Sequence, residues 1–144
     1  VLIPESYVPD LHLRLSLYRR LAALSDAKEI DAFGAELIDR FGPIPDEVEH
    51  LLKIMFIKGL CRIANVEKVD AGPKGVVLTF RNKAFPNPTA LVRYIGEQGS
   101  LAKLKPDQRL VILRDWPVAE KRLKGSAIIL SQLARLAREN EKAA

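Results

Sequence analysis

Apolar residues recur at every third or fourth position through about residue 65, a period that is typical of amphipathic helices. The sequence predicts a first helix over 11–24 after Asp10, and a second helix after Asp26. Asp26 followed by Glu29 resembles a capping box. The expected core positions are Leu11, Leu15, Leu17, Tyr18, Leu21, Ala22 and Leu24 in the first helix and Ile30, Phe33, Leu37, Ile38 and Phe41 in the second.

The stretch ELIDRFGPIPDEVEHLL, residues 36–52, predicts a rigid corner between two helices. Gly42 suits the left-handed residue that ends a helix, and Pro43 prevents its continuation. Pro45 is preset for the start of the next helix, which carries acidic residues at its positive end. This third helix, residues 47–66, is apolar almost all round, so we expect it to be the most buried one.

Beyond Asn65 the apolar period changes to two, which indicates strands. The sequence predicts a hairpin that turns at 72–75, a short helix over 89–99, a second hairpin that turns at 105–107, and a last helix over 118–142. The core stripe of the last helix is expected to contain Ile128, Leu130, Leu133 and Leu136. The predicted fold class is α+β: a helical part, about 1–65, packed on a small, mainly antiparallel sheet of two hairpins with a long C-terminal helix, about 66–140.

The 144 residues, 48% of them hydrophobic, suit one domain spanning 1–144. Because there is no run of 18 apolar residues and no signal peptide, we expect a soluble, cytoplasmic protein. The start at Val1, without an initiator methionine, suggests a fragment of a longer polypeptide.

The net charge of +5 is unevenly distributed. Residues 1–66 hold 8 Lys and Arg against 10 Asp and Glu, whereas residues 67–144 hold 15 against 8. The second half therefore allows either a basic patch for an acidic partner, nucleic acid included, or an ordinary solvated face. The candidate residues are Arg109, Arg114, Lys121 and Arg122, with Lys103, Lys105 and Lys124 nearby.

The sequence offers no recognisable catalytic or metal-binding constellation. It has no Gly-Lys dipeptide and hence no Walker A phosphate loop, and the glycines at 72–75 fit a plain turn. His12 and His50 lack metal-ligand spacing, and Cys61 on an apolar helix is expected to be inert. Trp116 beside a proline is expected to be a packing anchor.

The outward face of the second helix is the other candidate surface. With Ile30 at 0°, Asp39 falls at about 180° and Glu36 at about 240°, beside Ala32 and Ala35. Small side chains with a few charges suit a surface that another protein approaches, although a plain exposed helix also fits.

Several motifs together resemble the C-terminal domain of the bacterial transcription-repair coupling factors, the TRCF domain. They are LIP at 2–4, YVPD at 7–10, LRL at 13–15, YRR at 18–20 and ELIDRFG at 36–42. In that family the full-length protein is an ATP-driven DNA translocase that displaces stalled RNA polymerase and recruits the excision-repair protein UvrA. The resemblance implies that ATP and Mg²⁺ belong to a motor outside this chain, which is then neither an enzyme nor a cofactor-binding domain.

The resemblance further implies that this domain docks on an N-terminal module similar to UvrB and masks its UvrA-binding surface. Glu36, Asp39 and, beside them, Arg40 would form that interdomain contact, with the carboxylates meeting arginines of the partner. The domain would then act as an autoinhibitory lid in transcription-coupled repair. A basic nucleic-acid-binding module remains the alternative.

Overall fold

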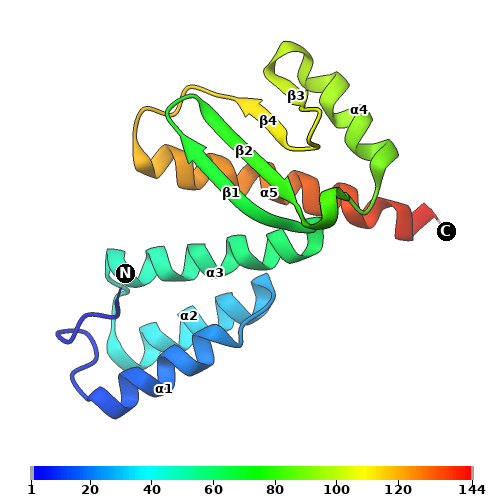
Figure 1. Cartoon of the computed structure of the whole chain (residues 1–144). Helices are drawn as coiled ribbons and strands as arrows, with labels where there is room; N and C mark the ends of the chain where they lie inside the picture. The colour runs from blue at the N-terminus through cyan, green and yellow to red at the C-terminus, as the bar shows by residue number, and fades with distance from the viewer. Residues whose placement is uncertain (1, 144) are drawn as a thin grey trace. The chain divides into compact units, whose positions relative to one another are not determined.

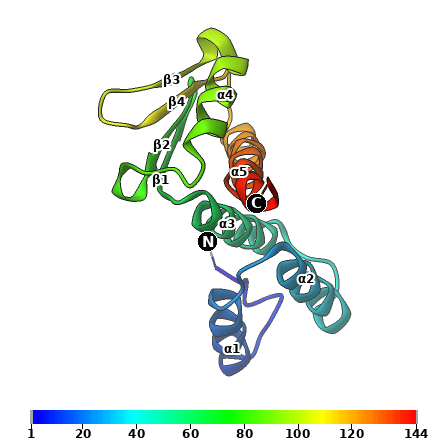
Figure 2. The same ribbon diagram turned by 90° about the vertical axis from the view of Figure 1, so that its right-hand side faces the viewer.

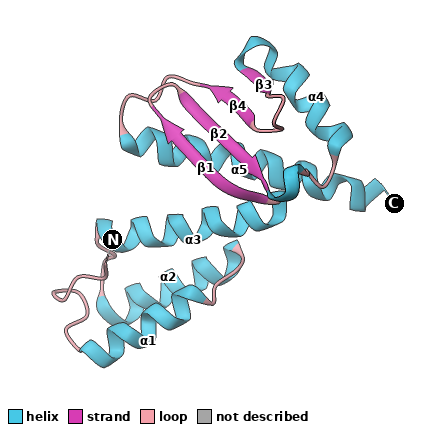
Figure 3. Ribbon diagram, viewed as in Figure 1, coloured by secondary structure: helices cyan, strands magenta, loops and turns pink. Residues whose placement is uncertain are grey.

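The chain is described here from a computed structural model, which covers the backbone of residues 2–143 and the side chains of residues 2–139. The described residues form five α-helices, two short 3-10 turns and a four-stranded antiparallel sheet, so the α+β prediction is confirmed (Figures 1 and 3). The chain divides into two compact units, Val1–Gly59 and Leu60–Ala144. The boundary lies inside the third helix. No described helix has the length and apolar content that a membrane span needs.

The first unit contains α1 (Leu11–Ala22), α2 (Ala27–Phe41) and most of α3 (Asp46–Ala64). The side chain of Asp10 accepts a hydrogen bond from the Leu13 amide at the start of α1. Asp26 likewise accepts from the Glu29 amide at the start of α2, at 2.8 Å. Gly42 ends α2 with φ of 89°, a conformation that favours glycine. These caps confirm the predicted starts and the predicted corner.

The N-terminal segment before α1 is tied to the helices by polar contacts. Tyr7 donates its hydroxyl hydrogen to the carbonyls of Leu37, at 3.1 Å, and Gly42, at 2.8 Å. The Ile3 amide donates to the hydroxyl of Tyr18. The segment therefore covers one side of the helical core. The buried members of this core are Ile3, Val8, Leu17, Leu21, Phe33, Leu37 and Val48.

Part of the predicted helical core is wrong. Leu11 and Leu15 are 56% and 44% exposed, and Ile38 is 54% exposed. Each lies at the edge of the apolar stripe of its helix. The stripe is wider than the part of the helix surface that neighbouring segments cover. The expectation for the third helix is also wrong, because Val48, Gly59 and Ala64 are its only buried positions and the other apolar side chains of α3 are half-buried.

The sheet of the second unit is built from two antiparallel hairpins in the order β1-β2-β4-β3. Its strands are β1 (Val66–Gly72), β2 (Gly75–Phe80), β3 (Ala102–Leu104) and β4 (Leu110–Leu113). Gly72 pairs with Gly75 across the first turn, so the plain-turn prediction is confirmed. Gly75 has φ of 131°, and a Cβ there would lie 2.0 Å from the carbonyl oxygen of Ile112.

Two helices lie on the same side of this sheet, α4 (Pro88–Gln98) and α5 (Ala119–Ala143), as the turned view shows (Figure 2). Alternate residues of β2, namely Val76, Leu78 and Phe80, are buried while those between them are half-buried. This alternation is the two-faced burial that a period of two predicts.

Trp116 is 8% exposed, and its indole ring packs against α5 so closely that a Cβ on Gly125 would lie 2.3 Å from it. The packing-anchor prediction for Trp116 is thus confirmed. The predicted stripe of α5 needs one correction, because Ile128 is 53% exposed and the adjacent Ile129 is buried in its place. Leu130, Leu133 and Leu136 are buried as predicted.

Candidate docking surface

The outer side of α2 presents small and charged side chains to solvent. Ala32, Ala35 and Asp39 are all exposed, on the side of the helix opposite the buried Ile30 and Leu37. For Asp39, no hydrogen bond or ion pair is found among the described residues. The small side chains expected from the sequence are therefore exposed on this face. The Asp39 carboxylate beside them has no partner within the described part of the chain.

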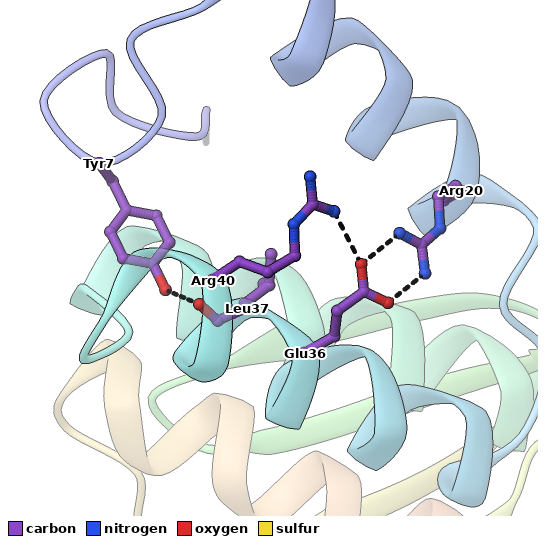
Figure 4. Close-up of polar contacts among 5 residues, drawn as sticks. All are labelled: Tyr7, Arg20, Glu36, Leu37 and Arg40. Carbon is purple, nitrogen blue, oxygen red and sulfur yellow. Dashed lines mark hydrogen bonds and ion pairs between the residues drawn. The ribbon is translucent and has the colours of Figure 1, made fainter.

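Glu36 lies on the side of α2 that faces α1, and its carboxylate joins the two helices (Figure 4). Arg20 of α1 donates from Nη1 to Oε2 at 2.6 Å and from Nη2 to Oε1 at 2.7 Å. Arg40, one turn further along α2, donates from Nη1 to Oε2 at 2.9 Å. The two predicted acidic residues thus have different environments: Glu36 is paired within the unit, whereas Asp39 has no partner among the described residues.

Both arginines also lie over aromatic rings. The guanidinium carbon of Arg20 is 5.1 Å from the centroid of the Phe33 ring, and that of Arg40 is 5.0 Å from the centroid of Phe41. Cation–π contacts of this kind add a modest attraction and hold the planar group in one orientation. Glu36 is therefore bound by two guanidinium groups, and each of these packs on an aromatic ring of the same unit.

This arrangement shifts proton affinities in the direction expected for paired charges. The hydrogen bonds from Arg20 and Arg40 lower the pKa of Glu36 to about 2, and the hydrogen bond to Glu36 raises the pKa of Arg20. The Arg20 and Glu36 side chains are 45% and 33% exposed, so solvent screens the pair. We expect it to contribute about 1 kcal/mol or less to the stability of the fold.

Sequence reasoning placed Glu36, Asp39 and Arg40 on one surface but missed Arg20. Arg20 is 16 residues from Glu36, and the pattern of α1 alone does not say which residue of α2 it meets. The sequence signal for Arg20 was weak: Arg19 and Arg20 are two adjacent cations in the last turn of α1, where cations also complement the helix dipole.

The predicted basic patch is spread along the second unit. Arg109 and Arg114 lie just outside opposite ends of β4, about 16 Å apart at the usual rise of a strand. Arg109 pairs through Nε with Asp107 at 2.8 Å, and Arg114 donates to the side chain of Gln98 at 2.8 Å. Both guanidinium groups are partly occupied by the chain itself.

The other two patch residues belong to α5. Arg122 donates from Nε to the carbonyl of Trp116 at 3.0 Å, so it fastens the start of that helix. Lys121 is exposed, as are Lys103 and Lys124, while Lys105 is half-buried. Lys121 and Arg122 are consecutive residues, whose side chains a helix turns about 100° apart, and Arg109 and Arg114 lie beyond opposite ends of β4.

The remaining candidates do not assemble a reactive site within the described residues. His12 and His50 are exposed on different helices. Burial raises the pKa of the Cys61 thiol, which disfavours the reactive thiolate. No group of three or more potential metal ligands is found among the described residues.

Comparison with known proteins identifies the family of this chain. A family model, the TRCF domain, matches residues 1–91. The transcription-repair-coupling factor of Rickettsia bellii is 40% identical over 129 residues, which is 90% of this chain and 11% of the relative. That of Escherichia coli K12 is 31% identical over 122 residues, 85% of this chain and 11% of the relative. The chain thus spans about a tenth of the length of these relatives.

A solved structure, the crystal structure of the C-terminal domain of a transcription-repair coupling factor, shares the fold. It aligns with a TM-score of 0.76 at 19% identity and covers 96% of this chain and 89% of that one. The family model matches more than half of this chain and agrees with the motifs at its N-terminus. The chain therefore belongs to the TRCF domain family.

Proposed function

We propose that this chain is a non-catalytic, autoinhibitory docking domain of a transcription-repair coupling DNA translocase. In this proposal the α2 face docks on the UvrB-like N-terminal module of the same protein and masks the surface that binds UvrA. RNA polymerase, DNA, ATP and Mg²⁺ are handled by other parts of the parent protein. Membership of the TRCF domain family supports a role in transcription-coupled repair.

The observation that carries the proposal is the carboxylate of Asp39, which is exposed on a helix face with small side chains and has no partner among the described residues. Ala32 and Ala35 beside it let another backbone come close, and Ile38 adds exposed apolar area at the edge. A free carboxylate on such a face suits a bidentate pair with an arginine of the partner. Arg40, held by Glu36, offers a second, oppositely charged contact that fixes the register.

The energetic demand on such a contact is small. A lid that is mostly closed yet able to open needs a preference of only about 2 to 5 kcal/mol for the closed state. Because the two modules belong to one polypeptide, their effective concentration is roughly millimolar. One good charge-assisted pair and a modest apolar contact meet this demand, and engagement of polymerase and DNA elsewhere then releases the lid.

The test uses the intact parent protein and its affinity for UvrA. Asp39→Lys should open the lid and raise UvrA affinity by about tenfold or more, since an attractive pair becomes repulsive. Glu67→Lys, an equal charge change at an exposed position on β1, is the matched control and should leave the affinity unchanged. If both variants bind UvrA like the unmodified protein, the α2 face is not the docking surface.

DNA binding by the isolated chain tests the nucleic-acid alternative. DNA binding by this chain should then fall steeply with salt and be lost when Arg109, Arg114, Lys121 and Arg122 are neutralised, but not with Asp39→Lys. Salt-sensitive DNA affinity together with unchanged UvrA binding would replace the docking proposal with that alternative.

A further inference from the structure

The carboxylate of Glu36 is close to saturated within the unit. Oε2 accepts one hydrogen bond from Arg20 and one from Arg40, and Oε1 accepts a second from Arg20. A carboxylate can accept about four hydrogen bonds, so roughly one position remains, on Oε1. A partner arginine therefore has no free two-oxygen edge at Glu36.

The side chain that blocks this edge comes from a different helix. Arg20 uses both terminal nitrogens of its guanidinium, the end-on form of the two-bond pairing, and lies over the buried Phe33. Arg40 uses only one nitrogen toward Glu36. Removal of Arg20 would thus free both oxygens of Glu36 for a second cation.

We propose that Arg20 is an internal competitor: it occupies the edge of Glu36 that a cationic side chain of the docking partner would otherwise take, and so weakens docking of the α2 face. This inference rests on the proposed docking function. Asp39 then anchors the closed state, while Glu36 is a reserve acceptor that becomes available only when Arg20 swings away.

An exchange of this kind keeps the closed state easy to open. When a partner arginine replaces Arg20 on Glu36, one ion pair forms and one is lost, so the gain in free energy is small. An unshielded Glu36 beside Asp39 would instead add a full charge-assisted pair to the contact. The internal pair therefore limits the strength of the contact while leaving its position unchanged.

The experiment compares UvrA affinity of the intact parent protein with and without Arg20. Arg20→Met keeps an unbranched apolar stem over Phe33 and removes the competing charge. It should tighten the lid and weaken UvrA binding about two- to fivefold at low salt, the range expected for an exposed charge-assisted pair. In a Glu36→Gln background the same substitution should have no effect, because the carboxylate that Arg20 occupies is no longer present.

Two further variants keep the test decisive. Arg19→Met removes an equal charge from the neighbouring exposed position, where no contact is found within the described residues, and should change UvrA affinity less than twofold. Arg20→Lys should act in the same direction as Arg20→Met but more weakly, because one ammonium group cannot cover both oxygens. Arg20→Lys also replaces Arg20→Met in the test if Arg20→Met fails to fold.

The outcomes separate this inference from the function on which it rests. If Asp39→Lys opens the lid and Arg20→Met also raises UvrA affinity, Arg20 supports docking and the competitor proposal is overturned. An Arg20→Met effect that persists without Glu36 overturns it as well. If Asp39→Lys has no effect, the docking function itself fails.

Discussion

In the second unit, strand residues two apart share a face, and alternate residues of β2 are buried, as a period of two predicts. In the first unit, the apolar stripes of α1 and α2 extend past the covered surface, so Leu15 and Ile38 remain exposed. A strand has two faces, and a pattern assigns each residue to one of them. A helix surface is continuous, so the pattern gives a direction but not the width that neighbours cover.

The two units also differ in the polar contacts that join their helices. In the first, Arg20, Glu36 and Arg40 form an exposed charged cluster between α1 and α2. In the second, α4 and α5 are joined by neutral hydrogen bonds, from Tyr94 to Gln132 and from the Asn87 side chain to the Leu136 carbonyl, together with one exposed ion pair. The charged cluster is thus the more pH-sensitive of the two, because the pKa of Glu36 is lowered to about 2.

The largest expected effect comes from the tight turn of the sheet. Gly75→Ala should lower the free energy of unfolding by roughly 3 to 5 kcal/mol, because a Cβ would collide with the Ile112 carbonyl at a φ that alanine avoids. Gly72→Ala, across the same turn with open space around it, is the control and should change stability by less than about 1 kcal/mol. Urea denaturation followed by circular dichroism measures both, and equal losses would contradict the assigned register.

A pair of leucines on α1 tests which side of that helix is the core. Leu17 is 1% exposed and Leu15 is 44% exposed, so Leu17→Ala should cost about 3 kcal/mol and Leu15→Ala about 1 kcal/mol or less. Both are measured by urea denaturation. A larger loss for Leu15→Ala would mean that the Leu15 side of the predicted stripe, and not the Leu17 side, is the core.

The smallest effect concerns the charged cluster and depends on pH. The pKa of Glu36 in the folded chain is about 2, below the usual value of about 4.3 for an unfolded glutamate. Its contribution to stability is therefore complete above about pH 4.3 and is lost as the pH falls toward 2. Glu36→Gln should cost at most about 1 kcal/mol at pH 7 and almost nothing at pH 2.

This difference is measured by urea denaturation of both proteins at pH 2, 4 and 7. Asp39→Asn is the matched control, since Asp39 has no ion pair among the described residues, and should cost less than about 0.5 kcal/mol at pH 7. If Glu36→Gln costs the same at pH 2 and pH 7, the charge of the carboxylate does not account for the contribution of Glu36 to stability.

Much of the architecture was readable from the sequence because it depends on local chemistry. Asp10, Asp26 and Gly42 mark helix ends through their own hydrogen bonds or backbone freedom, and the strands follow from a period of two. The order β1-β2-β4-β3 was not readable, because the pairing of β2 with β4 joins segments that are more than thirty residues apart.

The candidate site divides in the same way. The sequence by itself determined that Asp39 and the two alanines share the outward face of α2, since helical geometry fixes which residues lie on one side. Only the tertiary structure decided that Glu36 faces Arg20 rather than solvent, because that contact depends on the rotation and register of α1 against α2. Those are set by the packing of many side chains at once, which no local pattern encodes.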